Sequence, residues 1–419
     1  MTKRTITVFE HESLRLGHPE EGRLSAKELE CLQLHAGDDG VPYYSLIHKG
    51  VKFCGYVGVI ALGGLNIEVL PKIDRGSEAQ WRKILIDMLR KVGSLEVMPT
   101  DEADLKLKKN SILDLYIWEF MKQVQLILHQ GLLKKYRKQE GNTTSLKGKL
   151  LFQKHLTKNI VHQEHFFVKY TVYDPHHLLN QLIYKALRLI KNLSVTGHIN
   201  AKVDAILLDF PEMNDIVVSE QTFDRIVYSR KNEHYRKAIM ISRLLLLNYH
   251  PDINSGKNQV MALMFDMNWL WEKFVYLSLK KYLVDATIKP QANKPYWRLF
   301  GKRPVNLRPD VVIKNAEQTY VLDTKWKLPN GNKPGYADLQ QMYAYTKYFG
   351  SDHTILCYPG TDENFVDGHF HHEDSGHGHY RCSVLRLKFD ISMYPSLQLA
   401  LWQKDIARTI GFYCKTEIA

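Results

Sequence analysis

The sequence contains few cysteines and no long hydrophobic run. Its five cysteines are scattered and form no C-x-x-C pair, which argues against a disulfide framework or a zinc ribbon and favours a reducing compartment. The richest apolar stretch, residues 238–247, is interrupted by Arg243 and is too short to cross a bilayer. No apolar run follows the N-terminus to serve as a signal peptide. We therefore expect a soluble, cytoplasmic protein that does not bind membranes.

Phosphate-binding glycine motifs are absent as well. Neither G-x-x-x-x-G-K-[ST] nor G-x-G-x-x-G occurs anywhere in the chain. The four glycines between residues 55 and 64 separate strand-like runs, as tight turns do. We therefore expect that this chain itself binds no nucleotide.

Positive charge exceeds negative charge. The 419 residues include 57 Lys and Arg against 45 Asp and Glu, a formal net charge of +12, which favours a polyanionic partner such as nucleic acid. The excess is concentrated in residues 133–158, where eight basic residues accompany one acidic residue, and such a block neutralises phosphates without reading base sequence. Its candidate nucleic-acid-binding residues are Arg137, Lys138, Lys147 and Lys149. A solvated surface, or a face for an acidic protein partner, is compatible with the same residues.

Length and hydrophobic periodicity predict a multidomain protein of the α+β or α/β class. We predict a β-rich N-terminal region (1–110), a mostly helical middle region that carries the basic block (111–255) and a C-terminal α/β domain (256–419). Strand-like runs occupy residues 5–9, 43–70, 354–359 and 384–389. Apolar residues recur at helical spacing from residue 80 and in residues 112–133, 178–193, 235–247, 261–283, 336–349 and 396–410.

Residues 307–327 hold the most informative pattern. Two strand-like runs flank a short polar segment, which predicts a β-hairpin. If Ala316 and Glu317 lie at the centre of the turn, Asp310 and Asp323 face each other with Cβ atoms about 4.5–5.5 Å apart. The two-residue period of a strand then puts Lys325 on the same face as Asp323. A lone Asp-x-Lys is often a surface ion pair, but a second aspartate on the facing strand favours a reactive site.

Two facing carboxylates repel each other unless a cation lies between them. Oxygen ligands suit Mg²⁺, which takes one or two carboxylates and keeps several waters, and Mn²⁺ is possible at the same place. A metal held in this way can activate water and neutralise charge on a phosphodiester. Lys325 could orient the attacking water or stabilise the developing oxyanion.

Three further residues are candidates for the same site. Glu272, on the predicted helix 261–283, could supply a third carboxylate, although a single glutamate on an amphipathic helix is usually solvated. Gln341 and Tyr345 are four residues apart on the predicted helix 336–349 and therefore share a face. They could position a phosphate or the attacking water, although a tyrosine stripe is more often part of a core.

A histidine-rich segment, residues 367–379, is a separate candidate for metal binding. It holds five histidines, at positions 369, 371, 372, 377 and 379, but glycine and acidic residues surround them. This composition favours an exposed loop over a structural zinc site.

These residues together resemble the McrC family, the nuclease subunits of modification-dependent McrBC restriction systems. The resemblance lies in residues 265–274, Arg308-Pro309-Asp310, Asp323-Thr324-Lys325 and the pair Gln341 and Tyr345, which look like a PD-(D/E)xK nuclease signature. Weaker similarity covers residues 131–149, 174–180 and 229–235. The histidine-rich segment is not part of the family pattern.

The resemblance implies a C-terminal restriction-endonuclease-like domain, with a mixed sheet flanked by helices. It implies these roles: Asp310, Asp323 and the Thr324 carbonyl as metal ligands, Lys325 as the catalytic lysine, Glu272 as an auxiliary carboxylate, and Gln341 and Tyr345 as supporting groups.

The resemblance also implies partners. It implies an endonuclease that cuts double-stranded DNA when recruited by an McrB-like AAA+ GTPase hexamer that recognises modified cytosine. The N-terminal part would dock into the GTPase ring and stimulate hydrolysis. The alternative is a non-cleaving regulatory subunit that binds DNA and activates the ring.

Overall fold

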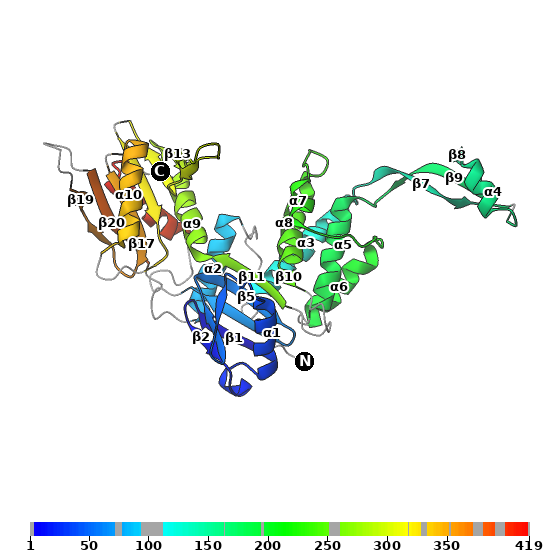
Figure 1. The fold of residues 1–419 in the computed structure, drawn as a ribbon, viewed down its shortest axis with the longest axis horizontal. Helices are drawn as coiled ribbons and strands as arrows, with labels where there is room; N and C mark the ends of the chain where they lie inside the picture. Colours follow the sequence, from blue (N-terminus) through cyan, green and yellow to red (C-terminus); the bar gives the residue numbers. More distant parts are fainter. Residues whose placement is uncertain are drawn as a thin grey trace. The chain divides into compact units, whose positions relative to one another are not determined.

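The computed structural model describes eleven stretches of the chain (Figure 1). They are residues 4–71, 78–93, 112–162, 164–193, 197–250, 260–316, 318–327, 333–351, 353–371, 380–389 and 399–417. The chain divides into two compact units, the first containing residues 1–5, 60–66 and 103–263, and the second residues 6–59, 67–102 and 264–419. The predicted mixture of helices and strands is confirmed, and the three-part division at residues 110 and 255 stays a prediction. Among the described residues, no helix combines the length and the apolar character that a membrane span requires.

The predicted strands near the N-terminus are confirmed. A five-stranded sheet has the order β1-β6-β5-β11-β10, with β1 at Arg4–Phe9, β5 at Tyr56–Leu62, β6 at Leu65–Leu70, β10 at Tyr249–His250 and β11 at Val260–Asp266. A three-stranded sheet has the order β2-β4-β3, with β2 at Ser13–Arg15, β3 at Tyr44–Ile47 and β4 at Gly50–Phe53. The short helices η1 (Pro19–Glu21) and α1 (Ala26–Ala36) lie between β2 and β3 in the chain. A capping box between Ser25 and Glu28 fixes the start of α1.

The helices of the first unit form a bundle. They are α3 (Ile112–Gln130), α5 (Leu178–Asn192), α6 (Gly197–Asp209), α7 (Glu220–Asp224), η3 (Glu233–Tyr235) and α8 (Arg236–Leu247). The predictions of helices at 112–133, 178–193 and 235–247 are therefore confirmed within a few residues. Buried aromatic side chains, including Tyr116, Phe120 and Tyr235, fill the interior of the bundle.

The basic block folds as a ribbon of strands, which the sequence did not predict. β7 (Lys135–Thr143) pairs with β9 (Phe166–Asp174) over nine residues, β8 (Lys149–Leu150) joins β9, and α4 (Phe152–Lys158) follows (Figure 1). Polar, charged β7 has little strand propensity of its own, whereas β9 is rich in β-branched and aromatic residues. The pairing with β9 therefore determines the conformation of β7.

One buried side chain connects the start of β7 and the end of β9 to the bundle. The amide of Asn180 donates to the carbonyl of Leu133 at 2.8 Å and to that of Pro175 at 2.7 Å. The hydroxyl of Tyr235 donates to Asn180 Oδ1 and accepts from the backbone N–H of Leu133, each at 2.8 Å. Leu133 precedes β7 and Pro175 follows β9, so this network fixes the base of the ribbon.

The largest sheet of the second unit is mixed. Its order is β12-β15-β16-β17-β20-β18, and β19 also pairs with β20. The strands are β12 (Thr287–Pro290), β15 (Val311–Lys314), β16 (Thr319–Thr324), β17 (His353–Gly360), β18 (Asn364–Val366), β19 (His369–Phe370) and β20 (Tyr380–Lys388). β17 runs parallel to β16 and β20, and the remaining pairs are antiparallel. A separate two-stranded hairpin joins β13 (Lys294–Trp297) to β14 (Val305–Leu307).

Besides η1 and α1, the described part of the second unit contains the helices α2 (Glu78–Val92), α9 (Met267–Tyr282), α10 (Tyr336–Phe349) and α11 (Leu399–Tyr413). α10 lies against β16, β17 and β20, and α9 packs with α11 and α2. The predicted helices 336–349 and 396–410, and the helix expected from residue 80, are confirmed. The prediction of a loop over the histidine-rich segment does not hold at His369–Phe370, which form β19, and residues 372–379 lie outside the described residues, so it stays a prediction there.

The prediction of one helix over residues 261–283 is wrong at its start. Val260–Asp266 forms β11, which pairs with β10, and α9 begins only at Met267. The side chain of Asp266 caps the helix by accepting the N–H of Asn268 at 2.8 Å. A short apolar run fits a strand and a helix equally well, so periodicity alone could not locate this boundary.

Candidate active site

The hairpin of β15 and β16 has the predicted register. Val311 lies opposite Leu322 and Lys314 lies opposite Thr319, so the turn falls on the four residues between them. Continuing this register by one residue brings Asp310 opposite Asp323. The two aspartates therefore face each other at the open end of the hairpin, one residue beyond the pair of Val311 and Leu322.

Asp310 is held by the strand that faces it. Its Oδ2 accepts the backbone N–H of Thr324 at 2.6 Å and the Thr324 hydroxyl at 2.8 Å. Burial raises the pKa of Asp310, and the two hydrogen bonds from Thr324 oppose that rise. Thr324, whose carbonyl is also a predicted metal ligand, therefore fixes the carboxylate of Asp310 in one orientation.

Asp323 is the most deeply buried acid of the cluster, with 1% of its surface exposed. Burial, and then repulsion by Asp310, raises its pKa to about 6, against the opposing effect of Lys325. Lys325 Nζ lies 2.8 Å from Asp323 Oδ2, yet that buried oxygen has no well-directed hydrogen bond from the described residues. The ion pair leaves the oxygen able to accept a further ligand.

Lys325 remains a cation at neutral pH. Burial lowers the pKa of its ammonium group, but Asp323 and Asp310 outweigh that effect and the pKa lies above its usual value. A lysine in this state can neutralise negative charge and donate hydrogen bonds.

Gln341 and Tyr345 extend the cluster into α10. Lys325 Nζ donates to Gln341 Oε1 at 3.3 Å, and Gln341 Nε2 donates to the hydroxyl of Tyr345 at 2.7 Å. The Tyr345 hydroxyl in turn donates to the carbonyl of Arg308 at 3.1 Å. This series of hydrogen bonds starts at Lys325 and ends at Arg308, two residues before Asp310. Side chains of α10 therefore link the segment that carries Lys325 to the segment that carries Asp310.

Glu272 is buried on α9 and faces the same cluster. Burial, and then the charge of Asp310, raises its pKa. Its Oε1 accepts from the side chain of Gln291 at 3.0 Å and lies 3.8 Å from Lys273 Nζ. All six side chains predicted for catalysis therefore gather in one unit of the fold.

Sequence reasoning missed three residues that hold this cluster together. Gln291 donates its backbone N–H to the carbonyl of Asp310 at 3.0 Å and has a left-handed backbone, with φ of 44°. Asn268 Oδ1 accepts the N–H of Trp326 at 3.1 Å, and Glu10 Oε1 accepts from the indole of Trp326 at 2.7 Å. Glu10 and Gln291 lie outside every segment that carries the resemblance, whereas Asn268 lies in residues 265–274 but was not assigned a role of its own.

The donor set fits a hard divalent cation. Among the described residues, no three His, Cys, Asp or Glu side chains converge closely enough to enclose a metal by themselves. Mg²⁺ does not require such an enclosure, because it takes one or two carboxylates and retains waters. Asp310 and Asp323 supply two carboxylates whose mutual repulsion a cation would relieve.

The four basic residues predicted to bind nucleic acid belong to the first unit, in the ribbon and its tip. Arg137 forms an ion pair with Asp174 at 2.7 Å and thereby lowers the pKa of that carboxyl group. Lys147 lies over the ring of Tyr170, 4.1 Å from its centroid, while Lys138 and Lys149 are exposed. Arg137 thus stabilises the ribbon, whereas Lys138 and Lys149 present their charges to solvent.

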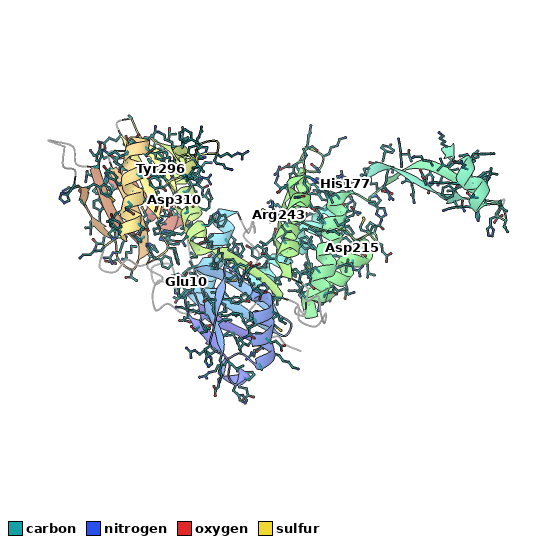
Figure 2. The ribbon with its side chains drawn as sticks, viewed as in Figure 1. Glu10, His177, Asp215, Arg243, Tyr296 and Asp310 are labelled. Carbon is teal, nitrogen blue, oxygen red and sulfur yellow. The ribbon has the colours of Figure 1, made fainter. Side chains whose placement is uncertain are left out.

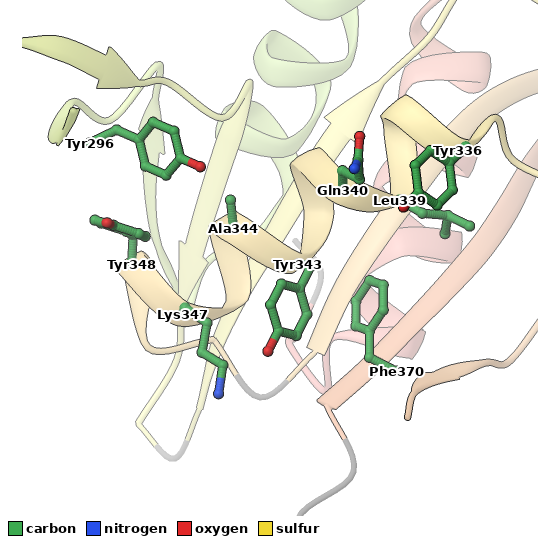
Figure 3. A pocket seen from close by; sticks show the side chains of 9 residues that line it. All are labelled: Tyr296, Tyr336, Leu339, Gln340, Tyr343, Ala344, Lys347, Tyr348 and Phe370. Carbon is green, nitrogen blue, oxygen red and sulfur yellow. The ribbon is translucent and has the colours of Figure 1, made fainter. Parts of the chain in front are cut away.

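The outer face of α10 borders a cavity of about 600 Å³ (Figure 3). The cavity is lined by Tyr296, Tyr336, Leu339, Gln340, Tyr343, Ala344, Lys347, Tyr348 and Phe370. None of these is a predicted site residue. The helix therefore turns Gln341 and Tyr345 toward the carboxylates and an aromatic surface toward the cavity.

Comparison with known proteins places the chain in a family. A family model described as "McrBC 5-methylcytosine restriction system component" matches residues 51–359, well over half of the chain. No curated protein matches.

Two solved structures resemble the fold. One is a chain of the refined half-complex from the tetradecameric assembly of Thermococcus gammatolerans McrB AAA+ hexamers with bound McrC. The TM-score is 0.65 and the sequence identity 19%, and the match covers 98% of this chain and 100% of that chain. The other, a chain of the Thermococcus gammatolerans McrBC complex, has a TM-score of 0.46 and 19% identity over 66% of this chain and 87% of that chain. At this identity the first likeness establishes the fold alone. The family match carries the assignment: the chain belongs to the family of McrBC 5-methylcytosine restriction system components, as its resemblance to McrC proteins predicted.

Proposed function

We propose that this chain is the nuclease subunit of a modification-dependent restriction complex and hydrolyses phosphodiester bonds in double-stranded DNA. The observation that carries the proposal is the meeting of Asp310 and Asp323 on facing strands, with Lys325 Nζ 2.8 Å from Asp323 Oδ2. The mixed sheet, with α9 and α10 packed against it, supports the proposal of a PD-(D/E)xK nuclease domain.

Asp310, Asp323 and the carbonyl of Thr324 would hold Mg²⁺ or Mn²⁺. When bound, such a metal would activate a water molecule and neutralise charge on the phosphodiester. Thr324 orients Asp310 through two hydrogen bonds, so the carboxylate is positioned before any ligand arrives. This preorganisation lowers the cost of assembling the site.

Lys325 would supply positive charge to the reacting phosphate. Its ammonium group is held between Asp323 and Gln341 and stays protonated, so it suits an oxyanion that gains charge during the reaction. Gln341 and Tyr345 position this lysine, and Glu272, whose pKa is raised by burial and by Asp310, would act as an auxiliary carboxyl group beside Asp310.

The partner in this proposal is an McrB-like AAA+ GTPase hexamer, and the substrate is DNA that contains modified cytosine. The family match supports this assignment, and the absence of Walker-type sequences agrees with a motor on a separate chain. The N-terminal part would dock into the ring and stimulate GTP hydrolysis.

A cleavage assay tests the nuclease. Methylated and unmethylated plasmids are incubated with the chain, the neighbouring GTPase, GTP and Mg²⁺, and Asp323→Ala is compared with the unchanged chain. We expect metal-dependent cutting of methylated plasmid that Asp323→Ala abolishes, while GTPase stimulation is retained. Full-rate cleavage by the variant would remove the site assignment.

A non-cleaving regulatory subunit is the second candidate. The ribbon favours it, because Tyr136 and Tyr173 form a tilted pair with ring centroids 4.7 Å apart and remain exposed, and aromatic residues are enriched in protein-binding surfaces. In the same assay this candidate predicts GTPase stimulation without metal-dependent cutting. The two candidates therefore give opposite results with the unchanged chain.

A further inference from the structure

The segment directly before Asp310 is strongly cationic. Residues 286–309 contain six Lys and Arg and no Asp or Glu. The cations are Lys289, Lys294, Arg298, Lys302, Arg303 and Arg308. This local excess is separate from the basic block of residues 133–158 and adjoins the candidate active site instead.

Much of this segment forms the β13–β14 hairpin, which stands apart from the main sheet. Lys294 pairs with Leu307 and Trp297 with Val305, and residues 298–303 at the tip are all exposed. Phe300 is fully exposed, and Trp297 is more than half exposed. A two-stranded hairpin is only marginally stable alone, and solvent-exposed aromatic side chains at its tip indicate a binding surface.

The base of the hairpin is anchored on α10, the helix that carries Gln341 and Tyr345 on its other face. Lys294 Nζ donates to the carbonyl of Tyr348 at 2.7 Å, and the rings of Tyr296 and Tyr348 meet edge to face at 5.2 Å (Figure 3). At the other strand, Leu307 packs on the core that contains Tyr345. Tyr296 and Asp310 both belong to the second unit (Figure 2), and Lys294 and Tyr296 anchor the base of the hairpin.

The charges at the tip are available to a ligand. Within the described part of the chain, no acidic side chain lies within ion-pair distance of Arg298, Lys302 or Arg303. Arg137, Arg243 and Arg381, in contrast, are each paired with a carboxylate. Three unneutralised cations around an exposed phenyl ring suit a polyanion that also offers apolar surface, which is the chemistry of DNA.

We propose that the β13–β14 hairpin, residues 294–307, binds the DNA duplex beside the phosphodiester that the carboxylates would cut. Arg298, Lys302 and Arg303 contact phosphates, and Phe300 packs against the bases in the groove between them. The position of the cut rests on the proposed nuclease function, but the binding of DNA by the hairpin does not require cleavage.

The phosphate contacts are tested by binding without divalent metal. The affinity of the full chain for a fluorescent duplex is measured by anisotropy in EDTA, between about 50 and 200 mM salt. We expect Arg298→Gln/Lys302→Gln/Arg303→Gln to bind at least about tenfold more weakly at low salt and to reduce the slope of log affinity against log salt by about 2–3, since each lost phosphate contact removes about 0.9.

A matched triple variant controls for net charge. Lys280→Gln/Lys281→Gln/Lys404→Gln removes three exposed cations from α9 and α11 of the same unit. We expect it to keep the slope and affinity of the unchanged chain. Equal weakening by the two triple variants, or unchanged binding by the hairpin variant, would overturn the proposal.

Phe300→Ala tests the apolar contact independently. Because the lost group is uncharged, we expect the affinity for duplex to fall while the salt slope stays the same. Leu401→Ala, at an exposed position of α11, serves as the control and should leave affinity unchanged. An affinity for Phe300→Ala equal to that of the unchanged chain would contradict the contact with bases.

The binding and cleavage results separate the two proposals. Weaker DNA binding by the hairpin variant, with no metal-dependent cutting by the unchanged complex, would keep the hairpin assignment and remove the nuclease. Cutting that depends on Asp323, together with normal DNA binding by the hairpin variant, would keep the nuclease assignment and remove the hairpin assignment. If that variant instead loses affinity only for the GTPase ring, the hairpin binds protein and the DNA assignment is wrong.

Discussion

At the scale of single residues, the carboxylates of the candidate active site are destabilising when no cation is bound. Asp323 is buried beside Asp310, and its pKa of about 6 lies above the ordinary value of 3.8. The folded chain therefore holds the proton more tightly than the unfolded chain. Ionisation of Asp323 consequently lowers the free energy of unfolding as the pH rises through 6.

We predict that Asp323→Asn stabilises the metal-free chain at pH 8. The neutral amide removes a penalty on the order of 3 kcal/mol, because the pKa of Asp323 lies about 2 above its ordinary value and one pKa unit corresponds to about 1.4 kcal/mol. The difference between variant and unchanged chain should shrink as the pH falls from 6 toward 4, where Asp323 is protonated. Denaturant unfolding in EDTA at several pH values measures it, with exposed Glu20→Gln as the control, and a variant less stable than the unchanged chain at pH 8 would contradict the electrostatic argument.

The hydrogen-bond relay from Lys325 through Gln341 to Tyr345 should act as one unit. We predict that Gln341→Ala and Tyr345→Phe each reduce the cleavage rate about tenfold, and that the double variant is little worse than either, since coupled residues are not additive. Tyr345→Phe should also lower stability by about 1 kcal/mol through the lost bond to Arg308. Single-turnover cleavage of methylated DNA by the complex measures the rates. Additive losses would show that the two side chains act separately.

At the scale of secondary-structure elements, Asn180 determines how the ribbon of β7 and β9 leaves the bundle. Its side chain satisfies the carbonyls of Leu133 and Pro175, and Tyr235 orients it. We predict that Asn180→Ala lowers the stability of the first unit by about 1–3 kcal/mol, because buried polar groups lose their partners.

Hydrogen exchange distinguishes this effect from a general loss of stability. Amides near the base of β7 and β9 should exchange faster in Asn180→Ala than in Arg188→Ala, which changes an exposed residue on the same helix. Uniform acceleration across the first unit would argue against a specific role at the base of the ribbon.

Elements with a regular apolar pattern could be predicted from sequence, and those formed by distant pairing could not. The helix at Tyr336–Phe349 was predicted with its bounds, because its apolar spacing is regular and Gly335 and Gly350 border it. The two aspartates were predicted to meet because a short hairpin fixes its own register. β7 could not be found, since its polar sequence becomes a strand only opposite β9. Gln291, which holds Asp310, acts through a left-handed backbone that the sequence does not reveal.

At the scale of the whole molecule, positive charge is distributed over two regions with different neighbours. In the ribbon, Arg137 is neutralised by Asp174, and Lys154 and Lys169 are paired with Glu140. At the tip of the β13–β14 hairpin, no comparable pairing occurs among the described residues. The net charge of +12 therefore does not show where DNA would bind. Several cations of the ribbon are already neutralised by acidic side chains, whereas those at the tip of the hairpin are not.

We predict accordingly that only part of the basic block contributes to DNA binding. Lys138→Gln/Lys147→Gln/Lys149→Gln should reduce the salt slope of duplex binding by up to about 3, since each of these lysines can contact one phosphate. Arg137→Gln should instead lower stability, because it leaves Asp174 without its partner, and should change the slope little. The measurements are anisotropy titrations of the full chain and GTPase stimulation with the partner. If the triple lysine variant keeps its DNA affinity and loses only GTPase stimulation, the ribbon contacts the protein ring, and the hairpin would then be the principal phosphate-binding region of this chain.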